Sequence, residues 1–534
     1  MTMSGRQVVC HIALGLMSII VVPAATSAQH YGAVPGAAMG GPYGWPAPPA
    51  AAAVPHAGAH GAPYWPAHAV PYAPQVSAHG PHAPYEMAGY RGDPAREGEG
   101  GYSGQAAADP YYDFGGSAYE LGDSAALAYT APEQPRGFFS RNARAEGGFF
   151  VDAWLSQGFT GNTASPASRF NSPLMFNDRA NEYQMNQLYL ALGREVATGY
   201  DTWDIGGRLD LLYGTDYLFV QSLGLETRRD GRQRWNSSQG PRADLAGNPD
   251  SAALYGLAMP QLYAEVYAPV AEGLRVKLGH FYTVLGYESP MAPENFFYSH
   301  SYAMQFGEPK THTGMLASLG LNPHLTIHGG FTRGWDVWED GNNIISFLGG
   351  ISRTSWDGRG SLALVVHSGN ERRPPDEPGE VGRLDNRTVY SLVWSRQFSD
   401  RFTYILQHDL GVESRATLQT PPRNATWYGL NQYFLCDLTE TTTLGLRFEW
   451  FRDSEHTRVF PIRQLLPVEG QDYFNFTVGL NWRPTTWMTV RPEVRWDWSN
   501  VVPPAVGDIE PEGMYNDFQD KMMLTLGGDV IIRF

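Results

Sequence analysis

From about residue 141 to the C-terminus, apolar and polar residues alternate along many short segments of the chain. In the last segment, every second residue from Met522 to Phe534 is apolar or glycine, whereas Lys521, Asp529 and Arg533 fall on the opposite face. Alternation with a period of two predicts β-strands, and no segment has the period of an amphipathic helix. We expect about sixteen strands (14–18), near 149–159, 183–194, 201–213, 260–270, 274–282, 311–321, 324–335, 344–353, 360–368, 387–398, 401–411, 425–437, 441–453, 472–483, 486–498 and 521–534.

Two features of these strands favour a membrane barrel over a soluble sandwich. Many are long enough to cross a bilayer, which takes ~9–11 residues per tilted strand, and Trp and Tyr recur near their ends. Arg491, Glu493, Arg495 and Asp497 occupy successive positions on one face of one strand. A sandwich core has no place for such a row of charges, whereas a water-filled lumen does. The barrel must also close, because an open edge in hydrocarbon leaves backbone groups unpaired.

The lengths of the connections give an independent indication of topology. Short turns, such as 271–273, 322–324, 399–400 and 484–485, alternate with long loops near 160–182, 214–259, 283–310, 369–386, 412–424, 454–471 and 499–520. Short periplasmic turns and long external loops are typical of outer-membrane barrels. Because the last strand descends to the periplasm, every long loop is expected outside. The sequence therefore predicts an all-β, transmembrane, antiparallel up-and-down β-barrel over residues 141–534.

The N-terminal part of the chain has a different character. Residues 1–28 combine Arg6, an apolar run and small residues before Gln29, which predicts a signal peptide and an exported protein. Residues 29–140 are a low-complexity extension rich in Pro, Ala, Gly and His, with too little bulky aliphatic surface to form a core. We expect this extension to be disordered and to face the periplasm.

Composition and motifs exclude several classes of function. The formal charge of -16 argues against a nucleic-acid partner. The chain lacks HExxH, GxSxG and phosphate-loop motifs, and its histidines do not have the spacing of a compact metal site. We therefore expect no enzyme activity, no cofactor and no metal.

Several segments together resemble the OmpL-like family of outer-membrane β-barrel porins. They include 279–288, 295–302, 309–314 and 334–336, and also 208–216, 447–453 and 491–497. The resemblance covers roughly 147–534 and implies a porin fold in the outer membrane. It implies little about the solute, and the first ~140 residues lie outside it.

The third long loop, about 283–310, is the expected constriction, because in general porins the third external loop folds into the barrel. The candidate constriction residues are Tyr287, Glu288, Glu294, Asn295, Tyr298, His300, Glu308 and Lys310. The candidate pore-wall residues are Arg208, Glu265, Arg275, Lys277, Arg447, Glu449, Arg491, Glu493 and Arg495. Charged groups and pore diameter together set selectivity in such a pore. For any one wall charge, a structural network is the simpler interpretation than direct contact with a solute.

The leading hypothesis is passive diffusion of small hydrophilic solutes or ions. The alternative is a plugged structural or adhesive barrel that tethers the cell envelope through its N-terminal arm. The expected partners are outer-membrane lipid, small hydrophilic solutes and the barrel-assembly machinery, which would read the strand ending at Phe534. General porins are often trimers, so a homo-oligomer is open by analogy.

Overall fold

The computed structural model describes residues 148–198, 201–228, 233–236, 254–339, 344–372, 384–417, 421–459, 470–504 and 510–534. It contains sixteen strands and three short helical turns, η1 (Thr215–Phe219), η2 (Ala292–Glu294) and η3 (Ala303–Gly307). The strands are β1 (Phe149–Asn162), β2 (Glu182–Arg194), β3 (Asp204–Gly214), β4 (Gly256–Ala268), β5 (Leu274–Tyr282), β6 (Thr311–Asn322), β7 (Leu325–Thr332), β8 (Ser346–Thr354), β9 (Gly360–Arg372), β10 (Leu384–Ser399), β11 (Phe402–Glu413), β12 (Ala425–Asp437), β13 (Thr442–Asp453), β14 (Asp472–Thr485), β15 (Met488–Ser499) and β16 (Met522–Arg533). Every predicted strand is present, and its ends lie within about four residues of the predicted ones.

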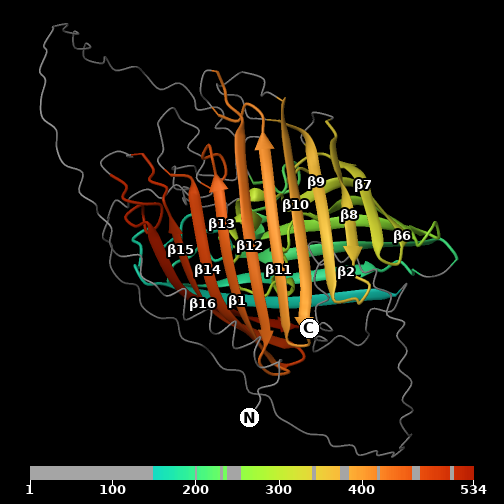
Figure 1. Ribbon diagram of the computed structural model, residues 1–534, viewed down its shortest axis with the longest axis horizontal. Helices are drawn as coiled ribbons and strands as arrows, with labels where there is room; N and C mark the ends of the chain where they lie inside the picture. Colours follow the sequence, from blue (N-terminus) through green and yellow to red (C-terminus); the bar gives the residue numbers. More distant parts are fainter. Residues whose placement is uncertain are drawn as a thin grey trace, which may run out of the picture.

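The strands form one closed antiparallel barrel in which each strand pairs with its neighbours in sequence (Figure 1). Closure is made by β1 and β16, in a register that runs from Trp154 opposite Arg533 to Asn162 opposite Thr525. The main-chain N–H of Phe534 continues this pairing by donating to the carbonyl of Ala153 at 2.8 Å. No strand edge is left open, as a barrel in hydrocarbon requires. The predicted all-β barrel fold is confirmed.

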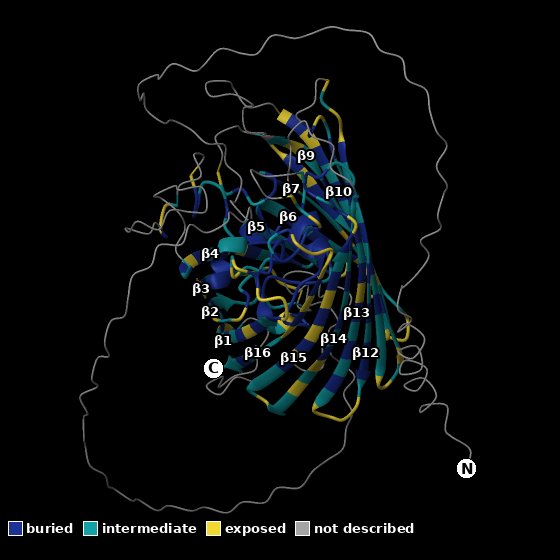
Figure 2. Ribbon diagram, turned by 90° about the vertical axis from the view of Figure 1, so that its left-hand side faces the viewer, coloured by how far each residue is buried: buried dark blue, intermediate teal, exposed yellow. Residues whose placement is uncertain are grey.

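The alternation in sequence becomes two chemically different faces of the wall. On β15 and β16, Val494, Trp496, Leu524 and Leu526 point outward and are exposed, whereas the charged residues between them are buried. Figure 2 shows the consequence for the whole barrel: buried segments, in dark blue, occupy the space that the strands enclose. The outward face is the apolar band expected against lipid, and the inward face is polar.

Long and short connections alternate around the barrel as predicted. The short turns include 269–273, 323–324, 400–401 and 486–487, and the long connections on the opposite rim include 163–181, 215–255, 283–310, 454–471 and 500–521. The segment between β7 and β8, residues 333–345, lies on the same rim as the long loops. Within the described ranges, no helix is long and apolar enough to cross a membrane.

The predicted signal peptide (1–28), the predicted low-complexity extension (29–140) and the first residues of the predicted barrel domain lie outside the described residues. Their predictions stay predictions.

Candidate functional site: the third external loop and the barrel wall

The third external loop, L3 (residues 283–310), leaves the rim after β5 and contacts the wall on the far side of the barrel. In a sixteen-strand barrel, the strand opposite β5 is β13. L3 forms hydrogen bonds with side chains of β10, β11, β12, β13 and β15, and also of β2. Because these side chains point inward, L3 lies inside the barrel and reaches across it.

Arginines of the wall bind the main-chain carbonyls of L3. The Nη1 of Arg491 donates to the carbonyls of residues 292, 295 and 297, at 2.8, 2.7 and 3.0 Å. Arg447 Nη1 donates to the carbonyl of Ser299 at 2.6 Å, and Arg495 Nη1 donates to that of His300 at 2.5 Å. A loop in a barrel lumen has carbonyls without secondary-structure partners, and charged donors satisfy them strongly.

Carboxylates of the wall bind the main-chain amides of the same loop. Glu493 accepts hydrogen bonds from the amides of Tyr298 (3.0 Å) and Ser299 (3.2 Å). Glu449 accepts from those of Tyr302 (2.7 Å) and Ala303 (2.8 Å). On β13 and β15, arginines therefore bind the carbonyls of the L3 backbone, and the glutamates that alternate with them bind its amides.

Each of these arginines also has a carboxylate partner. Arg491 makes two bonds of 2.7 Å to Asp529, and Arg495 makes bonds of 2.8 and 2.7 Å to Asp497. Arg447 is 2.8 Å from Glu288, which comes from L3 itself. Since both members of every pair are buried, the charges compensate one another inside the barrel.

Glu288 is the most highly connected carboxylate of L3. Besides Arg447 it accepts hydrogen bonds from the hydroxyl of Tyr433 (3.0 Å) and the amide of Ser301 (2.8 Å), and it lies 3.3 Å from Nδ1 of His300. Burial alone raises the pKa of a carboxyl group, but Arg447 and His300 outweigh burial and hold the pKa of Glu288 well below its usual range. Glu288 is therefore a buried anion that ties L3 to β12 and β13.

Three consecutive aromatic residues of L3 sit against glycines of three different strands. A Cβ added to Gly445 of β13 would lie 2.1 Å from the ring of Phe296, and one on Gly479 of β14 would lie 3.0 Å from Phe297. A Cβ on Gly158 of β1 would lie 2.6 Å from Tyr298. The inward glycines thus provide the space into which the aromatic rings of L3 pack.

The other predicted constriction residues have varied surroundings. The amide of Tyr287 donates to Gln407 at 2.8 Å. The side chain of Asn295 bonds within L3, to residues 289 and 291, and its carbonyl accepts from Arg491. Glu294 is exposed at the end of η2. Asn295 therefore shapes the loop, whereas the side chain of Glu294 is exposed.

The C-terminal end of L3 carries Glu308 and Lys310, both buried. The ammonium group of Lys310 donates to the carbonyls of residues 304, 305 and 308. Gln407 of β11 donates to Glu308 at 2.5 Å. Burial, together with the nearby Asp409, raises the pKa of Glu308 well above its usual range.

The predicted wall residues of β3, β4 and β5 bond mainly to one another rather than to L3. Arg208 pairs with Asp210 at 2.7 Å, and Glu265 pairs with Arg275 at 2.8 Å. The ammonium group of Lys277 lies 4.7 Å from the centre of the Tyr263 ring. Arg208 also contacts L3, where its Nη2 lies 3.5 Å from the sulfur of Met291. The predicted wall charges of β13 and β15 bind the L3 backbone, and those of β3, β4 and β5 bond mainly within these three strands.

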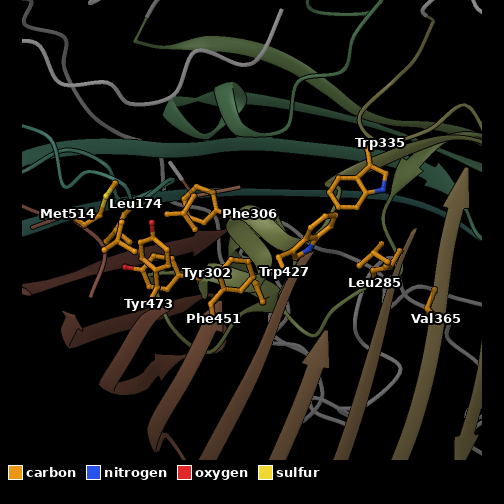
Figure 3. Close-up of a cluster of buried hydrophobic side chains, with 14 of the residues drawn as sticks. Leu174, Leu285, Tyr302, Phe306, Trp335, Val365, Trp427, Phe451, Tyr473 and Met514 are labelled. Carbon is orange, nitrogen blue, oxygen red and sulfur yellow. The ribbon is translucent and has the colours of Figure 1, made fainter. Parts of the chain in front are cut away.

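A hydrophobic cluster joins L3 to other external loops and to inward-facing residues of the strands, such as Val365 and Tyr473 (Figure 3). Tyr302 and Phe306 of L3 belong to it, and Trp335 of the β7–β8 connection stands edge-on to Trp427 of β12 at 6.1 Å. Other members come from residues 163–181, 454–471 and 500–521, namely Leu174, Val459, Val501, Met514, Tyr515 and Phe518. Parts of these external loops are therefore packed onto L3 and onto the inner face of the wall.

Several residues of this site were not among the predicted site residues, although Asp497 was predicted to lie on the inward, charged face of its strand. Asp497 and Asp529 complete the arginine pairs, and Gln407, Asp409 and Asn431 line the wall beside the end of L3. Their inward positions follow from strand alternation, but nothing in the sequence indicates which of them meet L3. In the described residues, no cluster of three or more His, Cys, Asp or Glu side chains is arranged to hold a metal ion.

Comparison with known proteins places this geometry in a family. The model of the family described as "Putative beta-barrel porin-2, OmpL-like" matches residues 148–534. The chain belongs to this family. As an OmpL-like β-barrel porin it is an outer-membrane protein, and the predicted family and location are confirmed. A search of curated proteins gave no match.

A search of solved structures found outer-membrane proteins that are similar to this chain at low sequence identity. The outer membrane channel DcaP of Acinetobacter baumannii is 9% identical, with a TM-score of 0.48 over 75% of this chain and 100% of that one. OprB of Pseudomonas putida is 12% identical, with a TM-score of 0.46 over 73% and 94%. An anion-selective porin from Comamonas acidovorans is 8% identical, with a TM-score of 0.45 over 72% and 99%.

Proposed function

We propose that this porin lets small hydrophilic solutes or ions diffuse across the outer membrane, and that L3 is the constriction of its lumen. The observation that carries the proposal is the binding of the L3 backbone by inward-facing charges of β13 and β15. Inward-facing charges are expected in a barrel whose lumen contains water, and they are not expected in a barrel with a dry, apolar interior. Held from the opposite wall, L3 narrows the lumen at a fixed place.

The proposal assigns different roles to the predicted residues. Arg447, Glu449, Arg491, Glu493 and Arg495 position L3. Solutes would pass the exposed Glu294 of L3 and the opposite side of the wall. That side carries Arg208, Glu265, Arg275 and Lys277.

Single-channel recording in planar bilayers tests the proposal directly. Purified, folded protein should give discrete conductance steps in KCl. Folded protein that inserts into the bilayer without any conductance step would count decisively against a diffusion pore.

The second candidate function is a plugged structural or adhesive barrel. The observation that favours it is the apolar packing of external loops against the inner face of the wall, where Tyr302, Phe306 and Trp335 of the loops and Trp427 of β12 are all buried. In this case bilayer conductance should be absent. Binding of isolated cell-wall polymer should then be lost when residues 29–135 are deleted. Conductance steps combined with no wall binding would exclude this candidate.

A further inference from the structure

The arginines that bind L3 each have a carboxylate partner, whereas one pair of neighbouring carboxylates beside L3 has no ion-pair partner among the described residues. Gln407 donates one hydrogen bond to Glu308 at 2.5 Å and another to Asp409 at 2.6 Å, so the two accepting oxygens are at most about 5 Å apart. Glu308 lies at the end of L3, and Asp409 lies on β11; both are buried. Two buried carboxylates this close repel each other strongly unless something neutralises them.

No described cationic group forms an ion pair with either carboxylate. Lys310 is the cation nearest in sequence to Glu308, but its ammonium group turns to three main-chain carbonyls. Lys310 is therefore close enough for its charge to act on Glu308, but it does not form an ion pair with the carboxylate. The other groups beside the pair include the neutral Gln407, which lies between the carboxylates, and Ser391 of β10, which lies opposite Asp409 in the β-sheet register. Contrast Arg491 with Asp529 and Arg495 with Asp497, where each carboxylate has its own guanidinium.

The second observation is a set of buried polar atoms without partners at the same place. Oδ1 of Asp409 accepts no hydrogen bond, and neither Oδ1 nor Nδ2 of Asn431 has a partner. Asn431 is fully buried on β12, directly opposite Gln407 in register and therefore beside the carboxylates. Buried polar groups almost always find partners, so a cluster of orphaned ones points to an unseen occupant.

The backbone of L3 is shaped around Glu308 as well. A Cβ on Gly286 would lie 2.0 Å from a carboxylate oxygen of Glu308, and Gly286 has a φ of +83°. Only glycine allows both this conformation and this approach. The position of the Glu308 carboxylate is therefore built into the loop.

We propose that Glu308, Asp409 and Asn431 form a binding site for a monovalent inorganic cation in the lumen, which makes the pore cation-selective. This inference rests on the proposed function and names its solute class. Carboxylate and amide oxygens are the ligands that hard cations prefer. A permeating ion must bind strongly enough to enter and weakly enough to leave, and two carboxylates with one amide give such a site. The positioning charges of β13 and β15 add no selectivity, because L3 and their partners neutralise them.

The test is the reversal potential of single channels across a KCl gradient, compared between wild type and Asp409→Asn. Removing one charge about 10 Å or less from the ion path should lower the K⁺-to-Cl⁻ permeability ratio by roughly threefold or more at an effective dielectric constant of about 50. Glu308→Gln should act in the same direction. Asp437→Asn is the matched control, because it removes the same charge near the far end of β12 and should change the ratio less.

Asn431→Leu tests the contribution of a neutral oxygen ligand separately from that of the carboxylate charges. The substitution leaves net charge unchanged but removes an oxygen ligand, so single-channel conductance should saturate at a higher KCl concentration than in wild type. Heat-modifiable migration on gels verifies that each variant is folded.

The possible outcomes are distinct. If wild type conducts and Asp409→Asn shifts the ratio no more than Asp437→Asn, the pair holds only a shared proton and the inference is overturned. If wild type prefers Cl⁻, the inference is also overturned. If folded wild type does not conduct, the proposed function itself fails.

Discussion

A single added methyl group on β13 should loosen L3 from the wall. In Gly445→Ala the new Cβ would lie 2.1, 2.6 and 2.7 Å from three atoms of the Phe296 ring. Non-bonded carbons normally approach to about 3.5–4.0 Å, so the nearest ring atom must retreat by roughly 1.4–1.9 Å. Phe296 is one residue from Phe297, which packs on Gly479 in the same way, so the ring cannot retreat without moving the loop.

The size of the effect follows from overpacking. Forcing extra carbon into a packed site costs typically about 1–3 kcal/mol, and this cost falls on the seated form of L3 alone. The population of unseated L3 should therefore rise roughly 5- to 150-fold. The matched control is Gly329→Ala on β7, where a Cβ would meet nothing within 4 Å. Both substitutions restrict the unfolded chain by about the same amount, so the comparison removes this effect.

Limited proteolysis measures the unseated population. Chymotrypsin cleaves after Phe and Tyr, and the bonds following Phe296, Phe297 and Tyr298 are protected while L3 is seated. When opening is fast relative to cleavage, the initial rate tracks the open population. Mass spectrometry of the fragments identifies cleavage within L3. Equal rates in Gly445→Ala, Gly329→Ala and wild type would refute the idea that the inward glycine seats the loop.

Two further predictions concern the charges that hold L3. Arg491→Met removes the bonds to L3 and leaves Asp529 as an unpaired buried charge. We expect the free energy of unfolding, measured by urea titration in detergent, to fall by about 3–5 kcal/mol. Adding Asp529→Asn should recover part of this loss, and no recovery would mean that the buried charge is not the cause. For Glu288, whose pKa lies below its usual value beside Arg447 and His300, the stabilising effect of the carboxylate is fully present above its unfolded pKa of about 4.3 and is lost as pH falls toward the folded pKa. The difference in unfolding free energy between wild type and Glu288→Gln should therefore be constant from pH 7 to about 5 and shrink below about pH 4; a difference that grows on acidification would contradict this assignment.

The strands of this protein could be predicted because each lies between two solvents. Lipid outside and a polar lumen inside force a period of two on every strand, and the outward Leu524 and Leu526 against the inward Asp529 are a direct result. The predicted ends of the strands were less accurate than their positions. For example, β4 begins at Gly256 and was predicted to begin near 260. Pairing can continue beyond the apolar band, where the hydrophobic signal no longer marks the strand.

The hydrogen-bond partners within the candidate site could not be predicted from the sequence. Arg491 was identified as an inward charge, but its bonds go to main-chain carbonyls of L3, which no side-chain pattern encodes. Gly445 carries a signal that could have been read. It is an inward glycine in a long strand, and such a glycine often marks close approach by another part of the chain.

Holding a loop inside a barrel solves two physical problems at once. The irregular backbone of L3 has amides and carbonyls that must find partners away from bulk water, and the wall has charges that must be neutralised. The carbonyls of L3 accept hydrogen bonds from Arg447, Arg491 and Arg495, and its amides donate to Glu449 and Glu493. The charge of the lumen therefore cannot be read from the composition of its wall. A passing ion experiences the charges that are left unpaired after this mutual neutralisation. Among the groups that contact L3, these unpaired charges are acidic.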